Sequence, residues 1–150
     1  MKRSLFAFVL CIALLLSRVT HAAEFLSILN PGAVSSDQTS APISISGSGL
    51  VVIAVKVTVC TACSMRMWVE THTGDGVWFG WWAGTVTDHA ATGDRYYLFS
   101  STGKLDGISV GDMSGTGNVA LTRPLPRYFR IRMAWTSGTT ATYTVTGVAY

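Results

Sequence analysis

The sequence has few charged residues, few cysteines and no long apolar run beyond its start. Only 13% of its 150 residues are charged, and it has three cysteines and four prolines. Three of the eleven basic residues lie within the first eighteen positions, so eight basic residues remain against eight acidic ones. Without a basic patch or an acidic run, we expect neither nucleic-acid nor calcium binding. The sequence also lacks a GxSxG, HExxH or phosphate-loop motif, which predicts a protein that is not an enzyme and uses no cofactor or metal.

The chain begins like a secretory signal peptide. Two basic residues are followed by an apolar stretch at 5–16, and small residues then allow cleavage after Ala22 or Ala23. About twelve apolar residues fall short of the roughly 20 that span a bilayer, so a cleaved leader is favoured over a membrane anchor. We therefore expect a signal-peptide helix at 1–23 and a single domain at 24–150. This domain would be exported through the inner membrane to the periplasm, the cell exterior or a virion surface, with no membrane span after cleavage.

The chain is rich in period-two alternation of apolar and polar residues. Residues 50–59 place Val and Ile on one face, and residues 64–70, 129–135 and 141–146 alternate in the same way. Such alternation, rich in β-branched residues, is typical of half-buried antiparallel strands. No amphipathic helix is expected after the leader. About eight short strands separated by Gly-rich turns indicate an all-β fold, namely an antiparallel β-sandwich of jelly-roll type.

Three turns connect neighbouring strands in this scheme. A Thr-Gly-Asp-Gly sequence at 73–76 is a strong turn signal. A three-residue turn at 137–139 keeps the apolar faces of its flanking strands aligned, which predicts a hairpin. At the Cys-Thr-Ala-Cys sequence 60–63, pairing Val59 with Met65 also aligns the apolar faces and predicts a wide hairpin loop. The alternative at 60–63 is a corner, with the two strands in different sheets.

Cys60 and Cys63 are the only cysteines after the leader. Their spacing within a turn and the expected export predict a local disulfide. Free thiols, a metal site and a redox site are the alternatives. A zinc site would need about four ligands, and only His72 and His89 could complete it. We expect both histidines to lie in solvated loops.

The aromatic stretch at 77–82 is the main candidate for a binding surface. Its rings could stack on sugars, could contact another protein or could fill the core. Because adjacent residues on a strand point opposite ways, at least one of Trp81 and Trp82 should leave the core. Two arginines on an outward strand face could meet phosphate or carboxylate, although such a stripe also keeps a strand soluble. The candidate ligand or interface residues are Trp78, Trp81, Trp82, Arg130 and Arg132.

Two segments carry a family resemblance. The sequence VETHTGDGVW at 69–78 and the tail PLPRYFRIRMAWTSGTTATYTVTGVAY at 124–150 resemble parts of small β-sandwich domains in uncharacterised bacteriophage and prophage structural proteins. The resemblance extends over 41–150, and no functional residue is transferred from it. It implies a non-enzymatic structural or attachment module. Such a module would contact copies of itself or other proteins in a phage-like or cell-surface assembly. The alternative function is a carbohydrate-binding β-sandwich that uses the aromatic stretch at 78–82 to hold a glycan.

Overall fold

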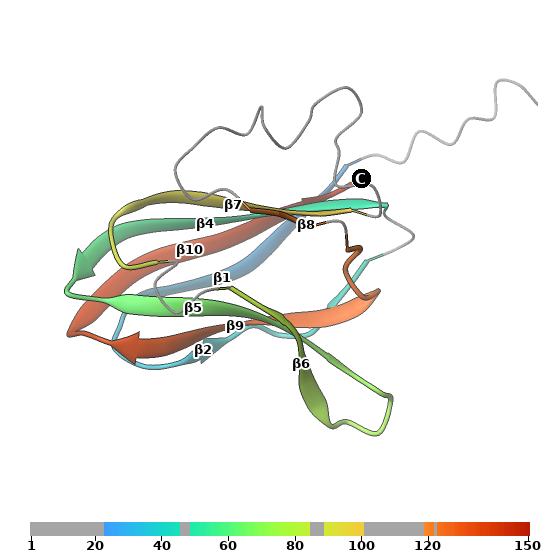
Figure 1. Ribbon diagram of the computed structural model, residues 1–150, viewed down its shortest axis with the longest axis horizontal. Helices are drawn as coiled ribbons and strands as arrows, with labels where there is room; N and C mark the ends of the chain where they lie inside the picture. Colours follow the sequence, from blue (N-terminus) through green and yellow to red (C-terminus); the bar gives the residue numbers. More distant parts are fainter. Residues whose placement is uncertain (1–22, 46–48, 85–88, 101–118, 122) are drawn as a thin grey trace, which may run out of the picture.

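The protein is an all-β sandwich of two sheets packed face to face (Figure 1). The structure is a computed structural model that describes residues 23–45, 49–84, 89–100, 119–121 and 123–150. These residues contain ten strands of two to twelve residues and no helix, which confirms the predicted all-β sandwich; about eight short strands were expected. The expected signal-peptide helix lies outside the described residues. Nowhere in the described part of the chain is there a helix that could cross a membrane.

The first sheet has the strand order β1-β10-β4-β7-β8. Its neighbours are antiparallel except for β8, which runs parallel to β7. Its strands are β1 (Glu24–Val34), β4 (Leu50–Thr61), β7 (Gly93–Ser100), β8 (Val119–Leu121) and β10 (Thr140–Ala149).

The second sheet has the order β2-β9-β5-β6, and a further short strand, β3, also pairs with β9. All its pairs are antiparallel. Its strands are β2 (Gln38–Thr39), β3 (Ile43–Ser44), β5 (Ser64–His72), β6 (Trp78–Ala83) and β9 (Tyr128–Ser137). The β5–β6 hairpin, joined at the predicted Gly-rich turn, projects beyond the body of the sandwich (Figure 1).

The core is built from the alternating apolar residues that the sequence predicts. The inner faces of β4, β5, β9 and β10 contribute Val51, Ile53, Val55, Val57, Met65, Met67, Val69, Phe129, Ile131, Met133, Ala141, Tyr143 and Val145. Val59, expected on this face, is exposed instead. Val57 pairs with Tyr143 and Val59 with Thr142, so β4 has one extra residue at this point. This bulge reverses the alternation and turns Val59 outward.

Two connections cross from one sheet to the other, where hairpins were expected. The strands β4 and β5 lie in different sheets, and so do β9 and β10. The hairpin predicted at 137–139 is therefore wrong, and at 60–63 the corner is correct rather than the wide loop. Alternation shows which face of a strand is buried, and both arrangements bury the same faces. It does not show which strand is the hydrogen-bonded neighbour.

The two corners pack against each other. The Thr139 N–H donates to the Thr61 carbonyl at 3.2 Å. Gly138 has a φ of +110°, and a Cβ atom there would collide with the Ala62 carbonyl and would lie 2.6 Å from the Cys63 Cα atom. Gly138 is thus required both by its backbone conformation and by the space available.

Cys60 and Cys63 join the two sheets covalently at the first of these corners. Their sulfur atoms are bonded at 2.00 Å, and their Cα atoms lie 5.2 Å apart. Cys60 is the second-last residue of β4, and the buried Cys63 directly precedes β5. The disulfide therefore holds the turn in which the chain changes sheet.

Replacing both cysteines with alanine should lower the free energy of unfolding by about 2 kcal/mol, the loop-closure value for so short a loop. The measurement is chemical denaturation of the wild type and the double variant. Reductant should destabilise the wild type by a similar amount and leave the variant unchanged. Two titratable thiols in unreduced protein, or a wild type insensitive to reductant, would contradict this assignment.

Candidate functional site

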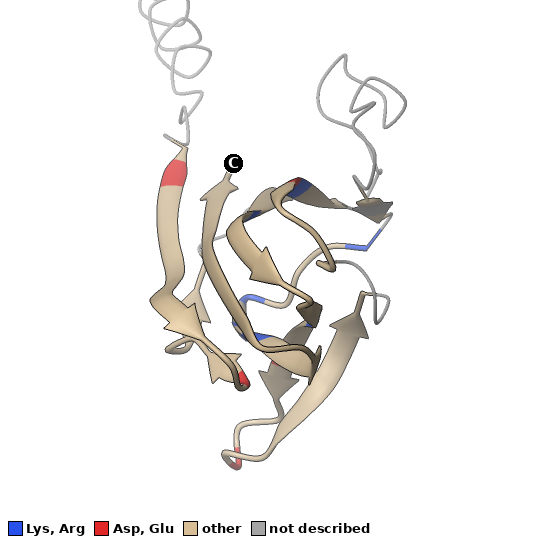
Figure 2. Cartoon of the chain, turned by 90° about the vertical axis from the view of Figure 1, so that its left-hand side faces the viewer, with Lys and Arg blue, Asp and Glu red and all other residues tan. Residues whose placement is uncertain are grey.

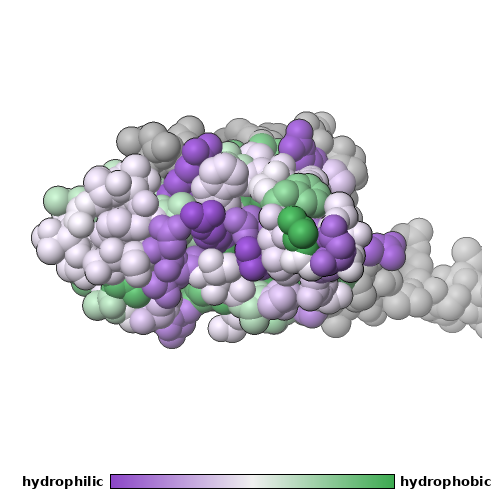
Figure 3. Space-filling model, turned by 90° about the horizontal axis from the view of Figure 1, so that it is seen from below, coloured by the Kyte–Doolittle hydropathy of each residue, from purple (hydrophilic) through white to green (hydrophobic). Residues whose placement is uncertain are grey.

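The candidate site is the outer face of the second sheet, formed by β5, β6 and β9. On β5 the inward Met67 and Val69 alternate with outward residues, and the same alternation continues on β9. Charged residues are sparse on the described strands (Figure 2). Seen from the side of the second sheet, a hydrophilic band crosses the molecule beside an apolar patch (Figure 3). We call this surface the outer face. Its main side chains are Arg66, Trp68, Glu70, His72, Trp78, Tyr128, Arg130 and Arg132.

Three of the five predicted site residues come together here. The guanidinium carbon of Arg130 lies 4.3 Å from the centre of the Trp78 ring. Arg132 follows two residues later on β9 and contacts the same carboxylate as Arg130. This grouping depends on the pairing of β9 with β5 and of β5 with β6, which no local sequence pattern specifies.

Trp81 and Trp82 pack against the core instead. The Trp82 ring centre lies 5.4 Å from that of Tyr97 and 5.5 Å from that of Phe99, and the Trp81 ring lies 6.4 Å from Phe99. The expectation that one of the two leaves the core is wrong. Opposite Val69 and Glu70, β6 has an extra residue at Trp81, because Trp82 pairs with Val69 and Gly80 with Glu70. Such a bulge disrupts strict alternation.

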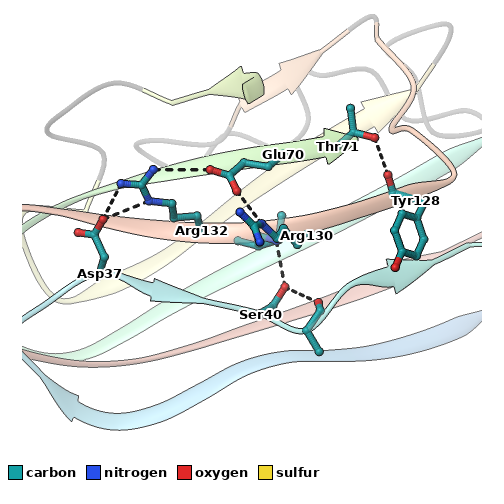
Figure 4. A network of polar contacts seen from close by, with 9 residues as sticks. Asp37, Ser40, Glu70, Thr71, Tyr128, Arg130 and Arg132 are labelled. Atoms are coloured by element: carbon teal, nitrogen blue, oxygen red, sulfur yellow. Dashed lines mark hydrogen bonds and ion pairs between the residues drawn. The ribbon is translucent and has the colours of Figure 1, made fainter. Parts of the chain in front are cut away.

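A chain of alternating charges runs across the outer face (Figure 4). The Glu70 side chain is only 9% exposed, and its Oε2 accepts a hydrogen bond from Arg130 Nε at 2.7 Å. Its Oε1 lies 3.6 Å from Arg132 Nη1. Arg132 Nη2 in turn donates to Asp37 Oδ2 at 2.6 Å, and Asp37 Oδ1 accepts the Trp135 N–H at 2.7 Å. The two arginines are therefore fixed in position by carboxylates that contact them from different strands and loops.

Asp37 should make folding stability sensitive to acid. Burial raises the pKa of the Asp37 carboxyl, but hydrogen bonds from Arg132 and the Trp135 N–H, with the charge of Arg132, outweigh it and hold the pKa below 3.8. Because the pKa of Asp37 is lower in the folded than in the unfolded state, its ionised carboxylate stabilises the fold above about pH 4. This stabilisation is lost as the pH falls through the folded-state pKa.

We therefore expect Asp37→Asn to lower the free energy of unfolding at pH 7 and to have less effect below pH 3. Because this ion pair is partly exposed, the difference should be below about 1 kcal/mol. Urea denaturation of both proteins between pH 2 and pH 7 provides the measurement. Wild-type and variant curves that stay parallel throughout would contradict the assignment.

An aromatic cluster occupies the end of the outer face near the β5–β6 turn. The Trp78 and Tyr128 rings are stacked, with centres 5.7 Å apart and an interplanar angle of 30°. The His72 ring meets both edge-on, at 4.8 Å from Trp78 and 4.6 Å from Tyr128. His72 Nδ1 also accepts the Gly74 N–H at 2.9 Å, which ties the cluster to the turn.

The histidine predictions are corrected by these positions. His72 is the last residue of β5 and half-buried in the aromatic cluster, not a solvated loop residue. His89 is buried, forms a β-bridge with Met65, and its Nε2 lies 2.9 Å from the Tyr97 hydroxyl. Neither position shows in the local sequence, because each depends on contacts with a strand elsewhere in the chain.

Trp68 lies along the sheet between a glycine and an arginine. A Cβ atom at Gly80 would be 2.7 Å from the Trp68 ring, so the ring covers that glycine. The guanidinium of Arg66 lies 4.6 Å from the ring centre, and Arg66 Nε donates to the Gly84 carbonyl at 2.6 Å. The contact between Arg66 and Trp68 could have been predicted from the sequence, since residues i and i+2 share a strand face.

Chemically, the outer face offers stacked rings and fixed guanidinium groups. Trp, Tyr and Arg are the residues that most often dominate the binding energy of protein interfaces. The described residues contain no cluster of His, Cys, Asp or Glu suited to a metal ion. No family model matches the chain, and no curated protein matches it.

Proposed function

We propose that the protein is a non-enzymatic structural or attachment module that works through protein–protein contacts in a phage-like or cell-surface assembly. The observation that carries the proposal is the composition of the outer face. Its side chains include the three residue types enriched in interface hot spots. They are Trp68, Trp78, Tyr128, Arg66, Arg130 and Arg132.

The fixed geometry of these side chains supports binding. Glu70 holds Arg130 and contacts Arg132, while Asp37 holds Arg132 from the other side. Ordering a free arginine at an interface costs about 0.5–1.5 kcal/mol, and a side chain that is already held costs less. The outer face is thus preorganised for a partner.

The alternative function, carbohydrate binding, depends on free ring faces. The rings of Trp81 and Trp82 pack on the core, and Trp68 lies between Gly80 and Arg66. The observation that favours this alternative is the stacked pair of Trp78 and Tyr128 beside polar side chains. A sugar site on this face would therefore use that pair instead of the whole aromatic stretch.

A glycan array of the wild type and Trp78→Ala, combined with light scattering, separates the two functions. If the protein works through protein contacts, the wild type should bind no glycan on the array in a way that depends on Trp78. A strictly monomeric protein that binds a defined glycan through Trp78 would overturn the proposal. Tyr96→Ala, on the opposite sheet, is the control for nonspecific effects of removing an aromatic side chain.

We further assign a jelly-roll topology and export. Two features support the topology. Four strands in the order β1-β10-β4-β7 face four strands in the order β2-β9-β5-β6, and the first and last strands of the chain are neighbours. The composition of residues 1–23 and the bond between Cys60 and Cys63 support export, since disulfides persist in oxidising compartments. N-terminal sequencing from the native host should find Ala23 or Glu24 first. A chain that retains Met1 in its assembled form would contradict export.

A further inference from the structure

The His72 ring connects the β5–β6 turn to the aromatic cluster of the outer face. Its Nδ1 accepts the Gly74 N–H at 2.9 Å, and the ring meets Trp78 and Tyr128 edge-on. His72 is also the residue that pairs with Trp78 in the ladder between β5 and β6, so the chain between these two residues forms the turn. One side chain therefore contacts both the turn and the stacked rings beside it.

The hydrogen bond from Gly74 exists only while His72 is neutral. A neutral imidazole has one nitrogen that accepts, and the Gly74 N–H identifies it here as Nδ1. A protonated ring carries an N–H on both nitrogens and accepts from neither. Turning the ring over would place a carbon beside the Gly74 N–H, which does not accept either. Protonation thus removes the acceptor in every orientation of the ring.

Asp75 is the acidic group of the turn. Hydrogen bonds from the Thr73 hydroxyl and the Val77 N–H, together with the charge of His72, hold the pKa of the Asp75 carboxyl below 3.8. Asp75 is therefore ionised over the range of about pH 5 to pH 8 in which histidines ordinarily change charge. It attracts a protonated ring, but Asp75 is exposed, so water screens the attraction.

The remaining ionisable groups that face the His72 ring come from β5 and β9. Arg130 lies against Trp78, so its charge opposes a second positive charge in the cluster. Glu70, two residues before His72, is held by Arg130, and Tyr128 contacts the ring through its own ring. The sequences of β3 and β6 contain no ionisable residue. None of these groups supplies a new acceptor for the Gly74 N–H.

We propose that His72 is a pH switch that orders the aromatic end of the outer face at neutral pH and loosens it in acid. When Nδ1 gains a proton, two N–H groups face each other, and either the ring or the turn moves away. Because the ring touches both Trp78 and Tyr128, the stacked pair moves with it. The switch acts within the chain itself, whereas its use in regulating a partner rests on the proposed function.

NMR spectroscopy between about pH 5 and pH 8 tests the switch. As the pH falls, the Gly74 amide proton should shift upfield because it loses its acceptor, and the indole N–H signal of Trp78 should shift with it. Both changes should have the same midpoint as the ring signals of His72. A His72 ring that gains no proton in this range, or a Gly74 or Trp78 signal that stays constant while His72 titrates, would overturn the proposal.

Two variants separate the acceptor from the ring. His72→Asn keeps a side-chain oxygen that accepts the N–H two residues on and gains no proton, so the Gly74 signal should stay constant. His72→Phe keeps a ring but has no acceptor, so the Gly74 signal should remain near the acidic position of the wild type at every pH. The buried His89 is unchanged in both variants. A Gly74 signal that still shifts with pH in His72→Asn would show that another group drives the change and would refute the switch.

The effect on binding is measured separately, by photo-crosslinking from position 128 at about pH 7.5 and about pH 5.5. The wild type should lose its protein adducts at the lower pH, and His72→Asn should keep them. Adducts that do not change with pH in the wild type would refute regulation by His72 alone. Absence of protein adducts at both pH values would refute the proposed function, and the NMR titration, which needs no partner, would still decide the switch.

Discussion

Gly138→Ala should lower the free energy of unfolding by about 4 kcal/mol, because two independent costs add at this position. The φ of +110° is a conformation that alanine adopts only with strain. The new Cβ would also meet the Ala62 carbonyl and the Cys63 Cα atom, which are backbone atoms of the other corner. Backbone atoms cannot move aside as a flexible side chain can, so one corner must shift away from the other.

Gly74→Ala is the matched control for this prediction. Gly74 has a φ of +103°, but a Cβ there would have no atom within 4 Å. This substitution should therefore cost only the conformational part, about 1–2 kcal/mol. Denaturant unfolding of the two variants provides the comparison. Equal losses would show that the contact between the two corners contributes nothing.

Arg130→Met should cost about 2–3 kcal/mol, because it leaves a buried carboxylate without its nearest partner. Glu70 is 9% exposed at its side chain and Arg130 is 27% exposed, so water screens this pair poorly. After the substitution, Arg132 at 3.6 Å is the remaining ion-pair partner of Glu70 among the residues that the structure describes. That contact is longer than the lost hydrogen bond and supports the carboxylate less.

Two variants separate the ion pair from the loss of side-chain packing. Arg132→Met removes a more exposed arginine and should cost less than about 1 kcal/mol. Adding Glu70→Gln to Arg130→Met removes the unpaired charge and should recover more than half of the loss. Thermal or urea unfolding gives all three values. An Arg130→Met variant no less stable than Arg132→Met would refute the buried pair.

The sequence was sufficient to predict which strand faces form the core. Alternation placed Ile53, Met67, Ile131 and Tyr143 inward, as the structure does. It could not predict the partners of each strand, because β4 and β5 bury the same faces in a hairpin or across a corner. Val59 was misplaced by a bulge that alternation cannot reveal. Strand pairing is set by contacts between distant segments, and period-two patterns are local.

The candidate site was predicted in part for the same reason. Trp78, Arg130 and Arg132 were recognised by residue type, and the structure brings them together. The prediction that at least one of Trp81 and Trp82 leaves the core was wrong, because the extra residue in β6 breaks the alternation and both rings pack against the core. Asp37 was missed because it reaches Arg132 from a loop 95 positions away in the sequence.

Site-specific photo-crosslinking tests protein contacts through the outer face most directly. A photoreactive phenylalanine analogue would replace Tyr128 on the outer face, or Tyr96 on the opposite sheet, in cells that produce the protein. The two positions are matched in exposure, at 40% and 38%. The account predicts defined protein adducts, to another copy or to another protein, from position 128 and not from position 96. No adduct at 128, or equal adducts at both positions, would contradict it.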